Sequence, residues 1–115
     1  MNLLIIALSK VDYKEDVFLA LQSVGITKAS TLDAENLSHE LGSEFSLFTG
    51  FFQGGDSHEG EKLIILAPID SPDDAAELLS NLEAGGIPVK EEDILDLFVV
   101  PLGLYFDQEK GLKKK

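Results

Sequence analysis

The chain has 115 residues, a length that suits one domain with a single hydrophobic core. It carries 21 acidic residues against nine basic ones, all lysines, for a formal net charge of -12. An acidic surface repels the phosphate backbone and no guanidinium is present to bind it, so the composition argues against nucleic acid as a partner. The absence of cysteine excludes disulfides and thiolate chemistry, and it is consistent with a cytoplasmic location.

The first third of the chain reads as strand, helix and strand. Residues 3–8 form an uninterrupted apolar run that predicts a β-strand. Asp12 is then expected to cap a helix, with Glu15 three residues later completing a capping box. Gly25 is expected to end that helix, and residues 26–33, rich in β-branched side chains, predict a second strand.

The same signals for strands, helix starts and helix ends recur in the second half with different residues. Residues 61–67 predict a strand, Ser71 followed by proline predicts a helix start, and Gly85 with Gly86 predicts its end. A last strand is expected over residues 95–100. A strand-helix-strand unit that occurs twice indicates an α+β fold, a ferredoxin-like βαββαβ sandwich. Such a fold has a four-stranded antiparallel sheet with two helices on one face.

The repeated unit defines the expected domain. Residues 1–103 are predicted to form one ferredoxin-like domain, and residues 104–115 a C-terminal extension or tail. The lysine run at 113–115 is expected to be solvated and frayed. Residues 1–8 are too short to span a bilayer and lack a basic flank, which favours a strand over a signal peptide.

The long connection between the second and third strands is the segment most suggestive of function. It covers residues 34–60, whereas a hairpin needs only a few residues, and long connections often carry binding residues. Four of the seven phenylalanines lie in it. Packing in a core or an interface is the expected role of these rings, with a ligand pocket or docking surface as the alternative.

In the predicted strands, the residues that point to either side of the sheet are apolar. In a sheet with helices on one face only, a solvated second face would give strands that alternate apolar and polar residues. Residues 3–8, 63–67 and 97–100 do not alternate in this way. We therefore expect the second face to be covered, either by the long connection or by another copy of the chain.

In this order of elements the chain resembles the PII-type nitrogen-regulatory signal proteins, and in particular their shorter PII-like relatives. The resemblance rests on residues 3–6, 25–33, 48–52 and 97–102, and it extends over residues 2–103. It implies a homotrimer with the sheets facing the centre and small-molecule ligands held in clefts between subunits. Members of this family typically sense adenine nucleotides or related metabolites, and their long loop engages or releases a target protein.

Carried over by position, the resemblance makes residues 34–60 the regulatory loop, with a membrane transporter or an enzyme as its target. It makes residues 85–93 the turn that meets a ligand phosphate, with Lys90 as the only cation there. Residues 34–37 replace the usual glycine-rich turn, and the usual arginines are absent, so a neutral or cationic ligand is an alternative to a nucleotide. The predicted ligand-binding residues are Asn36, Leu37, Gln53, Gly54, Gly55, Gly85, Gly86 and Lys90.

A second interpretation treats the connection as a metal site, and a third treats the chain as a ligand-free structural oligomer. The potential metal ligands are His39, Glu40, Asp56, His58 and Glu59. No two histidines stand four residues apart, and a solvated polar loop explains the same residues. A trimeric divalent-metal-binding protein, similar to the cation-tolerance family, is the corresponding alternative function. No nucleophile or phosphate-binding motif is present, so we expect a protein that is not an enzyme.

Overall fold

The computed structural model describes residues 1–35, 37 and 61–114. Its elements in chain order are β1 (Asn2–Leu8), the 3-10 turn η1 (Val11–Tyr13), α1 (Lys14–Ser23), β2 (Ser30–Glu35), β3 (Glu61–Ile69), α4 (Pro72–Ala84), β4 (Leu95–Pro101), β5 (Leu104–Asp107) and β6 (Gly111–Lys114). None of the helices in this part of the chain is long and apolar enough to cross a membrane.

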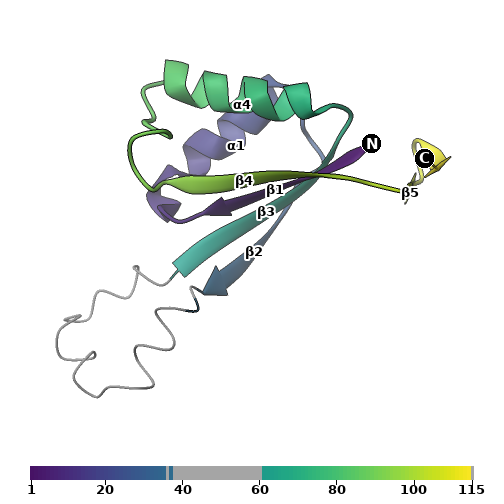
Figure 1. Cartoon of the computed structure of the whole chain (residues 1–115), viewed down its shortest axis with the longest axis horizontal. Helices are drawn as coiled ribbons and strands as arrows, with labels where there is room; N and C mark the ends of the chain where they lie inside the picture. The colour runs from purple at the N-terminus through teal and green to yellow at the C-terminus, as the bar shows by residue number, and fades with distance from the viewer. Residues whose placement is uncertain (36, 38–60, 115) are drawn as a thin grey trace.

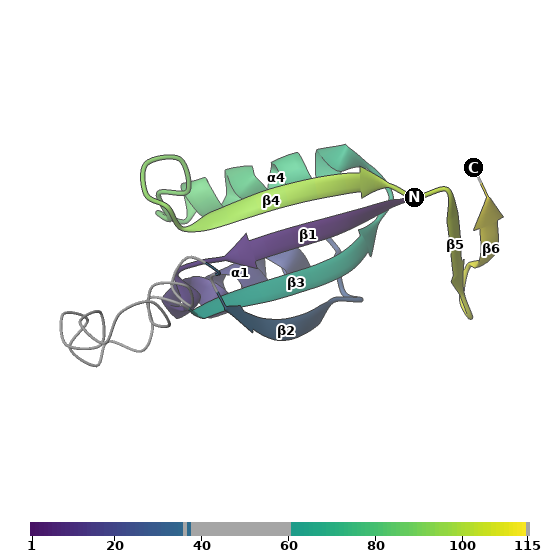
Figure 2. The ribbon, with the colours of Figure 1, turned by 60° about the horizontal axis from the view of Figure 1, so that its bottom comes forward.

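Four strands form an antiparallel sheet in the order β2-β3-β1-β4. Both α1 and α4 lie on the same face of this sheet, which gives the domain two layers (Figure 1). Turning the molecule brings the sheet forward with the two helices behind it (Figure 2). The expected α+β class, with a four-stranded antiparallel sheet and two helices, is confirmed, and the arrangement is compatible with a ferredoxin-like fold.

The hydrophobic core lies between the helices and one face of the sheet. Ile6 at the centre of β1 is opposite Ile65 of β3 and Leu97 of β4, and side chains opposite one another share a face. The fully or almost fully buried members of this core are Leu4, Ile6, Leu8, Val17, Leu21, Ile65, Ala67, Ile69, Ala75, Leu78, Leu82 and Ile94. Burial of these residues holds both helices against the sheet.

The two helices begin in different ways. Helix α4 starts as predicted, because the Ser71 hydroxyl accepts a hydrogen bond from the Asp73 amide at 3.1 Å, with proline at the first helical position. The predicted cap of α1 is wrong. Asp12 lies inside η1, Tyr13 occupies the N-cap position, and no side chain caps this helix. A 3-10 turn, in which the Tyr13 amide donates to the Lys10 carbonyl at 3.1 Å, leads into the helix instead.

Strand β2 begins four residues later than predicted and ends two residues later. The Ile26 amide donates to the Leu21 carbonyl at 2.9 Å, and the Ile26 side chain is buried in the core. Residues 26–29 therefore close the helix and cross to the sheet before pairing begins. As an edge strand, β2 leaves Thr31, Asp33 and Glu35 exposed.

The C-terminal residues form a hairpin of β5 and β6, so the expectation of a frayed lysine tail is wrong for Lys113 and Lys114. Lys113 pairs with Tyr105 and Lys114 with Leu104 across the two strands. The reversal is made possible by Gly111, whose φ of 71° lies in the region that favours glycine. Figure 1 shows the hairpin beyond the end of β4, next to the C-terminus. Lys115 is outside the described residues.

Candidate functional site

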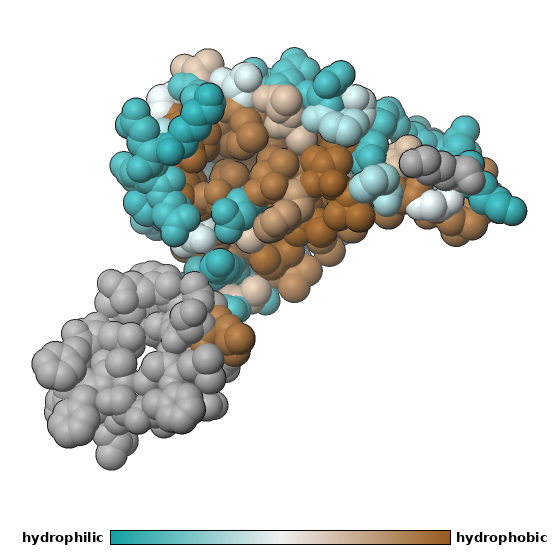
Figure 3. Space-filling model, in the orientation of Figure 1, coloured by the Kyte–Doolittle hydropathy of each residue, from teal (hydrophilic) through white to brown (hydrophobic). Residues whose placement is uncertain are grey.

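The sheet face turned away from the helices, here called the open face, is apolar. Its apolar members, identified from the strand register, are Leu3, Ile5, Ala7, Leu32, Ala34, Ile64, Leu66, Pro68, Phe98 and Val100. Lys62 and Asp96 are the two charged residues at the same parity within the described strands. Figure 3 shows hydrophobic surface running along the strands below the helices. This face therefore has the composition of a buried surface.

No segment among residues 1–35, 37 and 61–114 covers the open face, which lies uncovered toward the viewer in Figure 2. Phe98 is 54% exposed, Leu32 47% and Val100 42%, and they surround half-buried neighbours. Single exposed apolar side chains are ordinary, whereas a contiguous apolar patch marks an interaction surface. The open face is therefore a candidate interface.

The predicted ligand-binding residues that the structure describes lie at two edges of the sheet. Leu37 follows β2 and is 67% exposed, and the turn of residues 85–93 precedes β4. The end of β2 and the start of β4 lie at the same end of the sheet, but β3 and β1 separate the two strands. At the usual strand spacing that separation is about 14 Å. One subunit therefore does not bring these residues together.

Gly85 and Gly86 have a conformational role at the end of α4. The Gly85 amide donates to the Asn81 carbonyl at 3.0 Å, and the Gly86 amide donates to the Glu83 carbonyl at 3.0 Å. Gly86 has a φ of 91°, which favours glycine. Since both amides already have partners in the helix, neither is directed at an anion in this conformation. A role of these glycines in ligand binding stays a prediction.

Lys90 is the member of this turn that can reorient toward a ligand. Its Nζ lies 3.6 Å from Glu83 Oε1, and the lysine side chain is 80% exposed. Exposed ion pairs of this kind contribute little to stability, so exchanging Glu83 for another partner costs little.

Each of the two edges carries a hollow. Beside β4 and α4 a hollow of about 450 Å³ contains Lys90 together with the carboxylates of Glu83 and Asp96. At the end of β2 a hollow of about 480 Å³ contains two lysines and three acidic residues: Lys14, Lys62, Asp33, Glu35 and Glu61. Carboxylates outnumber lysines in both hollows, which disfavours a polyphosphate ligand.

The remaining predicted site residues are outside the described part of the chain. These are Asn36, Gln53, Gly54 and Gly55 among the ligand-binding residues, and His39, Glu40, Asp56, His58 and Glu59 among the potential metal ligands. The described residues contain no group of three or more histidine, cysteine or acidic side chains that could hold a metal ion. The metal interpretation is therefore untested by the structure.

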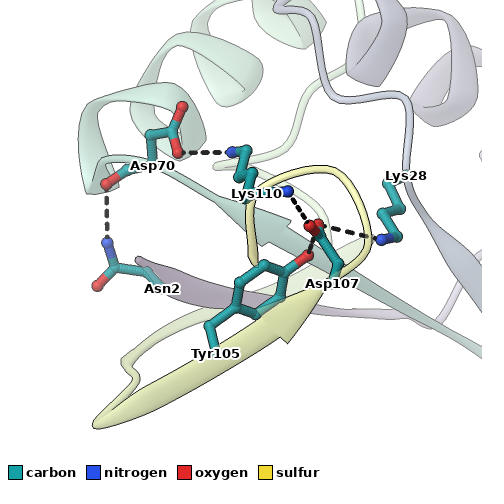
Figure 4. Close-up of polar contacts among 6 residues, drawn as sticks. All are labelled: Asn2, Lys28, Asp70, Tyr105, Asp107 and Lys110. Atoms are coloured by element: carbon teal, nitrogen blue, oxygen red, sulfur yellow. Dashed lines mark hydrogen bonds and ion pairs between the residues drawn. The ribbon is translucent and has the colours of Figure 1, made fainter. Parts of the chain in front are cut away.

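A polar cluster that was not predicted from the sequence joins the hairpin to the domain. The buried Asp107 carboxylate accepts hydrogen bonds from the Tyr105 hydroxyl at 2.6 Å and from the Lys110 amide, and it pairs with Lys28 at 3.2 Å (Figure 4). Lys110 also reaches Asp70 at 3.1 Å. The hydrogen bond from Tyr105, followed by those from Lys110 and Lys28, lowers the pKa of Asp107 to about 2. The alternation of polar and apolar residues over 104–107 was the available signal.

No protein-family model matches this sequence, and no curated protein matches it either. Functional inference therefore rests on the surfaces described above.

Proposed function

We propose that this protein is a PII-like regulator that is not an enzyme. It forms a homotrimer of ferredoxin-like subunits, binds a small effector in the clefts between them, and controls a partner protein through residues 34–60. A membrane transporter or a cytoplasmic enzyme is the proposed target, and the regulator itself acts in the cytoplasm. The observation that carries this proposal is the uncovered apolar face of the sheet.

The open face supplies the driving force for assembly. Fully burying one large apolar side chain contributes about 1.5–3 kcal/mol, and the open face presents several of them in one continuous surface. In a trimer each subunit covers the open faces of the other two around the axis. A second sheet face shielded from water accounts for strands that are apolar at both parities.

A cyclic trimer also provides a way to bring the two hollows together. Contacts in a threefold ring are heterologous, so unlike surfaces of neighbouring subunits face one another. The hollow at the end of β2 in one subunit and the hollow beside Lys90 in the next lie on unlike edges at the same end of the sheet. The ligand cleft is proposed to form where these hollows meet.

The charges of the two hollows suggest the class of effector. Together they hold five carboxylates and three lysines, and the protein contains no arginine. A neutral or amine-bearing metabolite fits this balance better than a nucleoside triphosphate does.

The first test is the mass of the protein by sedimentation equilibrium at micromolar concentration. The proposal predicts three times the 12.5 kDa subunit mass. A monomeric mass would overturn it, because the clefts would not exist.

The second test is a thermal-shift screen with ATP, amine-bearing metabolites and divalent cations. An effector that binds only the folded trimer raises the melting temperature. The proposal predicts that Lys90→Ala removes the shift and that Lys113→Ala, which deletes the same charge at the other end of the molecule, retains it. A response to metal ions alone supports a metal-binding trimer instead, and no response supports a structural oligomer.

A further inference from the structure

The β5–β6 hairpin has two chemically different faces. Its inner face carries Tyr105 and Asp107, which make the polar contacts with the domain. Its outer face carries Leu104, Phe106 and Leu112, which are 56%, 67% and 59% exposed. Lys114 lies opposite Leu104 and therefore belongs to the outer face. A short hairpin that presents three large apolar side chains to solvent has the character of a contact surface.

The contacts of the inner face hold the hairpin in one orientation. Lys28 pairs with Asp107 and Lys110 pairs with Asp70 (Figure 4). Just before the hairpin, the Leu102 amide donates to the Met1 carbonyl at 3.1 Å. These contacts join the hairpin to the loop after α1 and to the end of β3. The outer face consequently points away from its own domain, and none of the described residues covers it.

The charge of the hairpin indicates an acidic partner. Residues 104–115 contain four lysines and two acidic residues, whereas residues 1–103 contain five lysines and nineteen acidic residues. One of the two acids, Asp107, is buried and paired with Lys28, and Lys110 is paired with Asp70. Lys114 gives the outer face a positive charge beside its apolar side chains. A second copy of this chain is acidic and displays a large apolar surface, the open face. An anionic membrane would attract the hairpin lysines and repel the acidic domain.

We propose that the hairpin is an intersubunit arm. Its outer face docks on the open face of a neighbouring subunit along β4, where the apolar side chains of Phe98 and Val100 are 54% and 42% exposed. Lys114 then lies next to Asp96, the one acidic residue of the open face among the described strands. This inference rests on the proposed trimer and adds the segment that fastens one subunit to the next.

The test is the trimer dissociation constant, measured by analytical ultracentrifugation over a range of concentrations. The double variant Phe106→Ser, Leu112→Ser removes two apolar contacts from a surface that is exposed in the single subunit, so folding is retained. We expect dissociation to become at least about 100-fold easier. Leu19→Ser, which removes a side chain 64% exposed on α1, is the matched control and should leave the constant unchanged.

A charge exchange tests the docking position independently. Lys114→Glu and Asp96→Lys should each weaken the trimer by about 3- to 10-fold, and the two together should restore it. A trimer unaffected by all these variants overturns the arm and leaves the trimer standing. A wild-type monomer overturns the proposed function itself. Binding of the wild type, but not of the double serine variant, to phosphatidylserine vesicles, with the mass unchanged, would assign the hairpin to lipid and also overturn the arm.

Discussion

The two faces of the sheet differ in what covers them and not in their chemistry. On the helix side, Ile6 and Ile65 are fully buried by α1 and α4. One residue away in each strand, Ile5 and Ile64 belong to the open face and are only half-buried. Both pairs are β-branched and apolar, so the strands themselves do not distinguish the sides.

This difference shows that the sequence of a strand does not by itself tell which segment or subunit covers each of its faces. Strands in which apolar and polar residues alternate indicate a sheet with one solvent-exposed face. Strands that are apolar throughout indicate a sheet buried on both faces. The described residues supply one layer of helices for two apolar faces. We propose that a neighbouring subunit supplies the second cover, and the following variants compare the two faces.

The largest expected effect comes from the helix-covered face. Ile6→Ala should lower the free energy of unfolding by about 2–5 kcal/mol, because it leaves a cavity in a fully buried position. Urea unfolding followed by circular dichroism measures the loss. The neighbouring Ile5→Ala should give a loss that grows with protein concentration if, as proposed, a second copy buries this side chain. A loss for Ile5→Ala that is independent of concentration would place its cover within one chain.

A charge on the open face should break the assembly. Phe98→Asp replaces a half-exposed ring with a carboxylate that must be desolvated in any interface, and it should convert the proposed trimer to a folded monomer. Size-exclusion chromatography with light scattering gives the mass. Leu19→Asp puts the same charge on exposed α1 and should leave the mass unchanged. Equal masses for Phe98→Asp and the wild type would remove the open face as an interface.

A smaller effect is expected at the starts of the two covering helices. Ser71→Ala removes the hydroxyl that accepts from the Asp73 amide and should cost about 1 kcal/mol. Asp12→Ala should cost less, because no side chain caps α1. Melting curves of the two variants make the comparison directly. A larger loss for Asp12→Ala would contradict the assigned helix starts.

The smallest expected effect is confined to the hairpin and depends on pH. The pKa of Asp107 is lowered to about 2, below the usual aspartate value of about 3.9, so its contacts stabilise the folded state above pH 4. This stabilisation should fade as the pH falls from about 4 to 2. The protection of the amides of residues 104–114 against hydrogen exchange, relative to their intrinsic exchange rates, should fall over that range before the protection of β1 does. Asp107→Asn should exchange rapidly already at pH 6, and a hairpin equally protected in both proteins would contradict this role.

Much of the fold could be predicted because its signals are local. The start and end of α4 follow from Ser71 with proline and from the glycine pair, and both are observed. The start of α1 could not be read in the same way. Asp12 and Glu15 have the spacing of a capping box, but backbone hydrogen bonds within the 3-10 turn organise that end first. Side chains that can cap a helix do so only where the backbone leaves an amide for them.

The hairpin was missed because its stabilising contacts are distant in sequence. Asp107 and Lys28 are separated by 79 positions, and Lys110 and Asp70 by 40. The lysine run suggested a solvated tail, and no local pattern outweighed it. The candidate ligand residues present the same difficulty in stronger form. Leu37 and Lys90 belong to opposite edges of one sheet, and the proposed trimer brings such edges of neighbouring subunits together.

The acidic edge of the sheet has a consequence for how far association can go. Asp33 and Glu35 are exposed on β2, whose outer backbone groups have no neighbouring strand in the described sheet. An unprotected edge invites strand addition without limit, and negative side chains along it repel an identical edge. These carboxylates therefore disfavour open-ended strand addition along β2, a condition that the proposed closed trimer needs.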